Sequence, residues 1–184
     1  MNTRNMLFFD LETTGLDPKV AEIIEAAWRL TSPDGKKVLM ERTFKVFPEH
    51  METASKEALE VNGYTPEGWT RDQCISQEEF AKMFWQVSNH VVLGGHGVNF
   101  DEGFVREVMA RFNLKPKWHY QSADTQKLSW PLFITGRIPS VGLKHVSKYF
   151  GWQQPDPHRA LSDVDLTHKV FLALIDAYTK SLAA

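Results

Sequence analysis

The chain has 184 residues, a length that suits one globular domain. Apolar residues make up 42% and charged residues 24%, which is ordinary for a folded protein and excludes disorder of the chain as a whole. No apolar run approaches the ~18 residues of a membrane span, and the N-terminus carries no apolar signal segment. Cys74 is the only cysteine, which excludes an internal disulfide or a thiolate zinc cluster and favours a reducing, cytoplasmic setting without a membrane partner.

Charge is distributed unevenly along the chain, although the net charge is only −2. Residues 113–150 hold one acid, Asp124, and six bases, which are Lys115, Lys117, Lys127, Arg137, Lys144 and Lys148. The segment therefore carries 6 − 1 = +5, and the remaining residues carry (21 − 6) − (23 − 1) = −7. This pattern fits either a groove that follows a polyanion backbone or an ordinary solvated basic face.

Three strands are predicted in the first third of the chain, over residues 6–10, 22–30 and 36–46. A Pro33-Asp34-Gly35 turn joins the last two strands, so this pair is expected to be antiparallel. The third strand alternates apolar and polar residues, which predicts one buried face made by Val38, Met40, Phe44 and Val46.

Helices and short strands are predicted in the rest of the chain. The helices cover residues 55–59, 102–112, 141–150 and 164–178, and a further helix begins at the Ser76–Glu79 capping box. Short strands are expected at residues 91–93 and 122–124, and residues 126–140 read as a mobile loop. Pro155-Asp156-Pro157 is expected to rigidify the approach to the last helix. The order of elements predicts an α/β domain with a mixed sheet.

Four acids stand at positions where a hydrophobic element ends or a helix begins. Asp10 and Glu12 are two residues apart at the end of a buried strand, and this spacing places both carboxylates on one face. Asp101 and Asp163 each open a helix. Any one of them alone also fits a solvated strand end or a favourable helix N-terminus. A pair of like charges at a buried strand end, however, indicates a bound cation.

Four segments carry a family resemblance. They are Phe9-Asp10-Leu11-Glu12-Thr13-Thr14-Gly15-Leu16, His96-Gly97-Val98-Asn99-Phe100-Asp101-Glu102-Gly103-Phe104, Asp124-Thr125-Gln126-Lys127-Leu128 and His158-Arg159-Ala160-Leu161-Ser162-Asp163. In this order they resemble the DEDDh (DnaQ-like) family of 3′–5′ exonucleases, in the branch of the DNA polymerase III epsilon-like and exonuclease X-like enzymes. The resemblance runs from about Met6 to Leu174. Arg159 stands where the tyrosine branch has tyrosine, so the histidine branch is implied.

The resemblance implies one exonuclease domain over residues 1–184, with a ribonuclease H-like fold built on a mixed five-stranded sheet flanked by helices. It implies two Mg²⁺ or Mn²⁺ ions held by Asp10, Glu12, Asp101 and Asp163, which neutralise phosphate charge and activate water. Asp10 is expected to bridge the ions, Glu12 and Asp163 to lie on the nucleophile side, and Asp101 to act through water. His158 is the implied general base, because an imidazole can accept the proton of that water.

The implied subsite for the 3′-terminal nucleotide contains Thr13, Thr14, Gly15, Leu16, Asn62 and Phe100. Gly15 also fits an ordinary turn, and Phe100 and Phe104 follow a helical spacing that places them in the core. Gly97 replaces an asparagine common in the family, and Asn62-Gly63-Tyr64-Thr65 replaces His-Gly-Ile-Thr, so substrate contacts are less determined than the reaction.

The remaining aromatic candidates divide by their surroundings in the sequence. His96 is expected to be structural. Trp28 and Trp85 lie on apolar stripes and are expected in the core. Four tryptophans in loops are candidates for stacking on unpaired bases: Trp69, Trp118, Trp130 and Trp152.

The resulting hypothesis is a 3′–5′ exonuclease that releases nucleoside 5′-monophosphates from single-stranded DNA. The alternatives are an exoribonuclease or oligoribonuclease acting on RNA 3′ ends, and a non-catalytic nucleic-acid or polymerase-binding module that would lack one of the acids. Only residues 181–184 follow the last helix, so a free-standing enzyme is expected. Docking on a polymerase or another replication or repair protein stays open, as does the oligomeric state.

Overall fold

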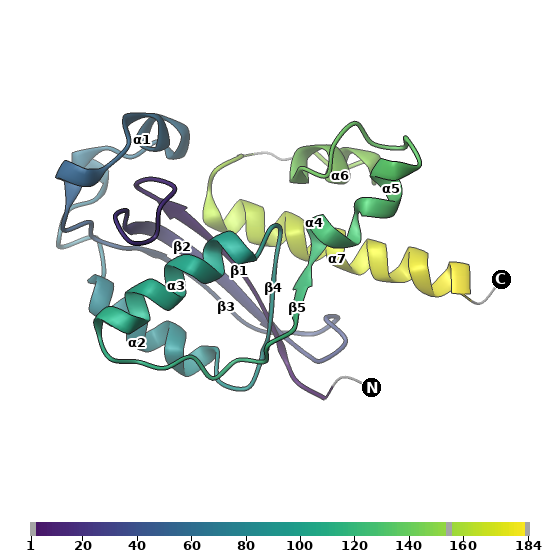
Figure 1. Ribbon diagram of the computed structural model, residues 1–184, viewed down its shortest axis with the longest axis horizontal. Coiled ribbons are helices and arrows are strands. Elements are labelled where there is room, and N and C mark those ends of the chain that lie inside the picture. The colour runs from purple at the N-terminus through teal and green to yellow at the C-terminus, as the bar shows by residue number, and fades with distance from the viewer. Residues whose placement is uncertain (1–2, 154–155, 183–184) are drawn as a thin grey trace.

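The computed structural model describes residues 3–153 and 156–182 (Figure 1). Pro155 of the proline-rich segment and Ala183 and Ala184 of the short tail lie outside the described residues, as does the start of the chain at Met1 and Asn2. No helix in the described part of the chain is long and apolar enough to cross a membrane.

A mixed five-stranded sheet with the order β3-β2-β1-β4-β5 forms the centre of the molecule. The pairs β1–β2 and β2–β3 are antiparallel, whereas β1–β4 and β4–β5 are parallel, which confirms the predicted mixed sheet. The strands are β1 (Met6–Thr13), β2 (Ile23–Thr31), β3 (Val38–Lys45), β4 (Val92–Gly95) and β5 (Ser122–Asp124).

Helices cover both faces of this sheet (Figure 1). The α-helices are α1 (Lys56–Asn62), α2 (Gln77–Val87), α3 (Asn99–Arg111), α4 (Thr125–Leu128), α5 (Trp130–Ile134), α6 (Leu143–Tyr149) and α7 (Ala160–Leu182), with 3-10 turns at Met51–Thr53 and Pro66–Gly68. The predicted Ser76 capping box is present, with Ser76 Oγ accepting from the Glu79 backbone and Glu79 accepting from Ser76.

Alternating side chains of β1 divide the core into two layers, as the twofold periodicity of a strand requires. Phe9 packs against Phe84 of α2 with a ring separation of 5.1 Å, and α3 completes that layer. Phe8 packs on the opposite face against Phe171 of α7, also at 5.1 Å. Asp10 and Glu12 share the Phe8 face, so their carboxylates point to the α7 side of the sheet.

Two local expectations are wrong in this structure. Residues 126–140, expected as a loop, contain the short helices α4 and α5, because the Asp124 side chain caps the first of them by accepting the N–H groups of Gln126 and Lys127. The third strand lies at the sheet edge, and Val38 and Met40 are exposed there, whereas Phe44 packs against the core and Val46 is buried as expected.

The aromatic residues also depart in part from expectation. Phe104 and Trp28 are in the core as predicted, whereas Phe100 is 41% exposed. Trp69 was a candidate for base stacking but is buried, and its Nε1 donates to the Ile24 carbonyl at 2.7 Å. Trp130 is half exposed at the start of α5, which leaves it accessible.

Candidate active site

The five residues expected to carry the chemistry line one open pocket of about 610 Å³: Asp10, Glu12, Asp101, His158 and Asp163. They come from three distant segments, which are β1, the start of α3 and the start of α7 with the turn that precedes it. The start of α7 lies beside the end of β1 in Figure 1. The fold therefore brings the sequence motifs to one place.

The end of β1 extends beyond its parallel partner, which pairs only from Met6 to Phe8. The Leu11 N–H is instead satisfied by Asp101 Oδ1 at 3.2 Å, so the first turn of α3 is joined directly to the strand that carries Asp10 and Glu12. Asp101 is buried, with 5% of its surface exposed. One of its oxygens is thus engaged by the backbone, and the other is left for a ligand.

The carboxylates raise one another's pKa values. Burial, followed by the charges of Asp101 and Asp163, raises the pKa of Asp10 well above its ordinary value. Burial and the charges of Asp163 and Glu25 raise the pKa of Glu12 to about 8. Burial raises the pKa of Asp101 to about 7, against the opposing hydrogen bond from Leu11. Such a cluster is stabilised by any cation that shares its oxygens.

The residues around the start of α7 complete the pocket. Glu12, Asp163 and His158 each place one ligand atom so that all three lie within 4.8 Å of one another. His158 is exposed and adopts a left-handed backbone with φ +63°. Its N–H donates to Asp163 Oδ2 at 3.3 Å. The imidazole is accessible to substrate and adjacent to two of the candidate metal ligands.

Five of the six residues expected to hold the terminal nucleotide also line the pocket: Thr13, Gly15, Leu16, Asn62 and Phe100. Leu16 is 82% exposed at the rim. Asn62 is buried and its Nδ2 donates to the Thr13 carbonyl at 3.0 Å, which ties α1 to the end of β1.

Thr14 does not line the pocket. It is fully buried, its N–H donates to the Glu22 carbonyl at 2.9 Å, and its own carbonyl accepts from Ser55 at 2.7 Å. Its hydroxyl accepts from the Glu22 N–H at 2.9 Å. Both backbone groups are therefore engaged within the protein, and Thr14 supports the loop instead of contacting a substrate.

The pocket contains residues that sequence reasoning missed. Val61 of α1 is 55% exposed and lines the pocket with Leu16 and Phe100, so three apolar side chains surround its acidic floor. Gln126 lines the opposite wall, next to Gly97. A solvent-exposed apolar residue on a short helix is a weak sequence signal for a binding site. The place of Val61 in the pocket becomes visible only from the packing of α1.

Gly97 and His96 follow the end of β4 and line the same pocket. Gly97 has φ +80°, a conformation that favours glycine, and its N–H donates to Asp124 Oδ1 at 3.0 Å. Nδ1 of His96 lies 2.9 Å from the Thr125 hydroxyl. Burial lowers the pKa of His96, which favours a neutral ring. These contacts indicate that His96 supports the structure of the pocket wall.

The basic residues of the 113–150 segment do not form one continuous surface around the pocket. Lys117 lies at the opposite end of the parallel strands, where its carbonyl accepts from His90 before β4 begins and its ammonium lies 4.7 Å from the Trp85 ring centre. Lys144 and Lys148 are exposed on α6, which follows Val141, a neighbour of His96. Lys117 therefore lies away from the pocket, whereas α6 begins close to His96, which lines it.

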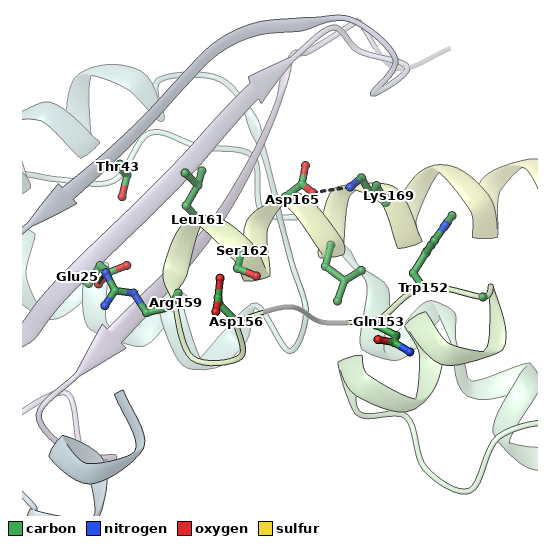
Figure 2. Close-up of a pocket in the computed structure, with 12 residues that line it drawn as sticks. Glu25, Thr43, Trp152, Gln153, Asp156, Arg159, Leu161, Ser162, Asp165 and Lys169 are labelled. Carbon is green, nitrogen blue, oxygen red and sulfur yellow. Dashed lines mark hydrogen bonds and ion pairs between the residues drawn. The ribbon is translucent and has the colours of Figure 1, made fainter. Parts of the chain in front are cut away.

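A second cavity, of about 890 Å³, is lined by residues of β2, β3 and the first turns of α7 (Figure 2). Its walls include Glu25, Arg159 and Trp152 but none of the five residues above.

Comparison with known proteins identifies relatives over most of the chain. A family model described as Exonuclease matches residues 7–171. The DNA polymerase III PolC-type of Thermotoga maritima is 29% identical over 171 residues, which are 93% of this chain and 12% of the relative. Ribonuclease T of Shewanella baltica (strain OS155) is 24% identical over 191 residues, covering 94% of this chain and 82% of the relative. The structure of E. coli exonuclease I with a dT13 oligonucleotide matches with a TM-score of 0.80 and 20% identity, over 94% of this chain and 40% of that chain.

The chain belongs to the exonuclease family, because the family model covers well over half of it. This confirms the DnaQ-like resemblance that the four motifs carry. The match to exonuclease I establishes the fold. The chain spans only about an eighth of the Thermotoga polymerase, so the relative's remaining parts have no counterpart among these residues.

Proposed function

We propose that this protein is a 3′–5′ exonuclease that hydrolyses the terminal phosphodiester of a nucleic-acid strand and releases nucleoside 5′-monophosphates. The observation that carries the proposal is the convergence of four acids and an accessible histidine on one open pocket within a fold of the exonuclease family. Loss of an acid would indicate a non-catalytic binding module, and all four are present at the pocket.

The donor set fits two hard divalent cations such as Mg²⁺ or Mn²⁺. Asp10, Glu12, Asp101 and Asp163 offer carboxylate oxygens, and burial together with neighbouring negative charges raises the pKa values of the first three. When bound, such ions neutralise phosphate charge and make water a stronger acid.

His158 is proposed as the general base. The side chain is exposed at the pocket and adjacent to Glu12 and Asp163, so it can accept a proton from the attacking water without blocking the acids. The exposed left-handed backbone places it at the pocket mouth, outside the first turn of α7.

The apolar residues around the acids are proposed to hold the terminal nucleotide. Leu16, Val61 and Phe100 offer faces for a base or sugar, and the backbone at Thr13 and Gly15 offers polar groups for a 3′ hydroxyl. An unpaired base gains about 1–3 kcal/mol from stacking on an aromatic ring, which makes Phe100 the strongest candidate contact. This arrangement favours a single-stranded end.

Single-stranded DNA is the proposed substrate, in line with the polymerase III relative and with the exonuclease I fold solved with dT13. RNA is the second candidate, because ribonuclease T matches over most of its length. A polymerase or another replication or repair protein is a candidate partner, on the strength of the polymerase relative.

Matched DNA and RNA oligonucleotides of several lengths, labelled at the 3′ or the 5′ end, test this function with and without Mg²⁺. We expect label at the 3′ end to appear at once as a mononucleotide and label at the 5′ end to shorten stepwise, both only with the metal. The relative rates on DNA and RNA assign the substrate. Internal cleavage, or equal turnover by Asp163→Asn, would contradict the proposal.

A further inference from the structure

A buried carboxylate that the sequence motifs do not include lies next to the acidic cluster. Glu25 of β2 pairs in register with Glu12 of β1, and directly opposed residues of an antiparallel pair point to the same face. Its side chain is only 5% exposed. Glu25 does not line the pocket that holds the five candidate active-site residues.

The two oxygens of Glu25 contact the two residues that follow His158. Oε1 accepts the Ala160 N–H at 3.2 Å, and Oε2 pairs with Arg159 Nη2 at 3.1 Å. Ala160 begins α7, so its N–H is one of the donors that have no partner within the helix. Figure 2 shows Arg159 extending from the start of α7 to Glu25.

The backbone of His158 needs such support. Its φ of +63° is unfavourable for a residue with a Cβ atom, so neighbouring contacts must hold it. Its own N–H donates to Asp163 Oδ2, and the next two residues are held by Glu25. Glu25 thus connects β2 to the turn that presents the imidazole.

We propose that Glu25 is a positioning residue for His158, acting through Arg159 and the Ala160 N–H. The proposal rests on the proposed function in one respect, since His158 is the base of that reaction. Glu25 does not line the pocket. Besides its charge, which raises the pKa of Glu12, it affects the reaction through the geometry of the turn.

A double-mutant cycle tests this role. Glu25→Ala removes both contacts, whereas Glu25→Gln keeps an oxygen for Ala160 and loses the ion pair. We expect Glu25→Ala to lower kcat on a labelled oligonucleotide by at least about tenfold with KM within about twofold, and Glu25→Gln to retain more activity. In the His158→Ala background, Glu25→Ala is expected to change the residual rate by less than about twofold, because the group it positions is gone. A full, independent loss in that background would overturn the proposal.

Glu22→Gln is the matched control. Glu22 is also buried, and its Oε2 accepts the backbone N–H groups of Glu49 and His50 at 2.7 and 2.8 Å, away from α7. We expect it to lower thermal stability without changing kcat. An equal fall in kcat for Glu22→Gln and Glu25→Gln would show that altering any buried carboxylate lowers activity. That result would overturn the positioning role of Glu25.

A spectroscopic measurement separates this proposal from the proposed function. In the metal-free protein, the ¹⁵N resonances of the His158 ring are expected to shift or broaden in Glu25→Gln, while Mg²⁺ affinity measured by calorimetry stays within about twofold. Unchanged His158 resonances, or a large loss of Mg²⁺ affinity, would overturn the positioning role. Both readouts hold even if the wild-type protein degrades neither DNA nor RNA, and Arg159→Gln serves where a Glu25 variant does not fold.

Discussion

Replacing Glu12 by glutamine is expected to stabilise the metal-free protein at alkaline pH. Burial and the charges of Asp163 and Glu25 raise the pKa of Glu12 from 4.5 to about 8. The folded state therefore holds a proton that the unfolded state has lost between these two values, and the stability of the wild-type protein falls as the pH rises through this window. Glutamine is never charged, so the variant does not show this loss.

The size of the effect follows from the same rise in pKa. At roughly 1.4 kcal/mol per pKa unit, the rise to about 8 corresponds to at most about 5 kcal/mol. Water still reaches part of the Glu12 carboxylate, so we expect a gain of about 2 kcal/mol at pH 8 and little difference at pH 5.

Urea unfolding in EDTA at pH 5 and pH 8 measures this difference. Glu60→Gln is the control, because Glu60 is exposed on α1 and pairs only loosely with Lys56 at 3.8 Å. Adding Mg²⁺ at pH 8 is expected to stabilise the wild-type protein more than Glu12→Gln, since the ion removes the same repulsion. A Glu12→Gln variant that is no more stable than wild type in EDTA at pH 8 would refute the reasoning.

Three further outcomes are expected from the site. His158→Ala lowers turnover by about two to four orders of magnitude while calorimetric Mg²⁺ binding persists, and a rate within about threefold of wild type would exclude it as the base. Asp163→Asn abolishes Mg²⁺-dependent turnover with the circular dichroism of a folded protein, and unchanged activity would remove it from the ligand set. Replacing Lys144 and Lys148 by glutamine flattens the salt dependence of oligonucleotide binding, whereas Lys117→Gln leaves it unchanged; the reverse result would place the strand elsewhere.

The sequence alone was sufficient to predict most helices and strands and to identify the four acids of the site. Periodicity and capping residues are local signals, and they located the strand at β5, the Ser76 cap and the stop of α6 near Gly151. The motifs determined which acids meet, because a pair such as Asp10 and Glu12 at a buried strand end has little other use. The helix α4 was missed because its cap, Asp124, was assigned to a short strand and to a motif, and α5 was missed because it begins without a side-chain cap.

Local sequence patterns did not predict which side chains in loops and at sheet edges are buried. The sequence around Trp69 is typical of an exposed loop. Trp69 is nevertheless buried, and its ring nitrogen donates a hydrogen bond to the Ile24 carbonyl. Phe100 follows core spacing, but α3 is oriented by the Asp101–Leu11 hydrogen bond so that Phe100 faces the pocket. Such outcomes depend on which surface an element meets, and a periodic pattern does not specify its partner.

The contacts that hold the site are decided by the tertiary structure. Thr14 stands inside a motif but points into the protein, whereas Val61 stands outside every motif and lines the pocket. Glu25 meets Arg159 and Ala160 across more than a hundred residues of chain, because antiparallel pairing of β1 and β2 brings it beneath the start of α7. Residue type and spacing determine which chemistry is possible, and only the packing of sheet against helix determines which groups are near enough to perform or support it.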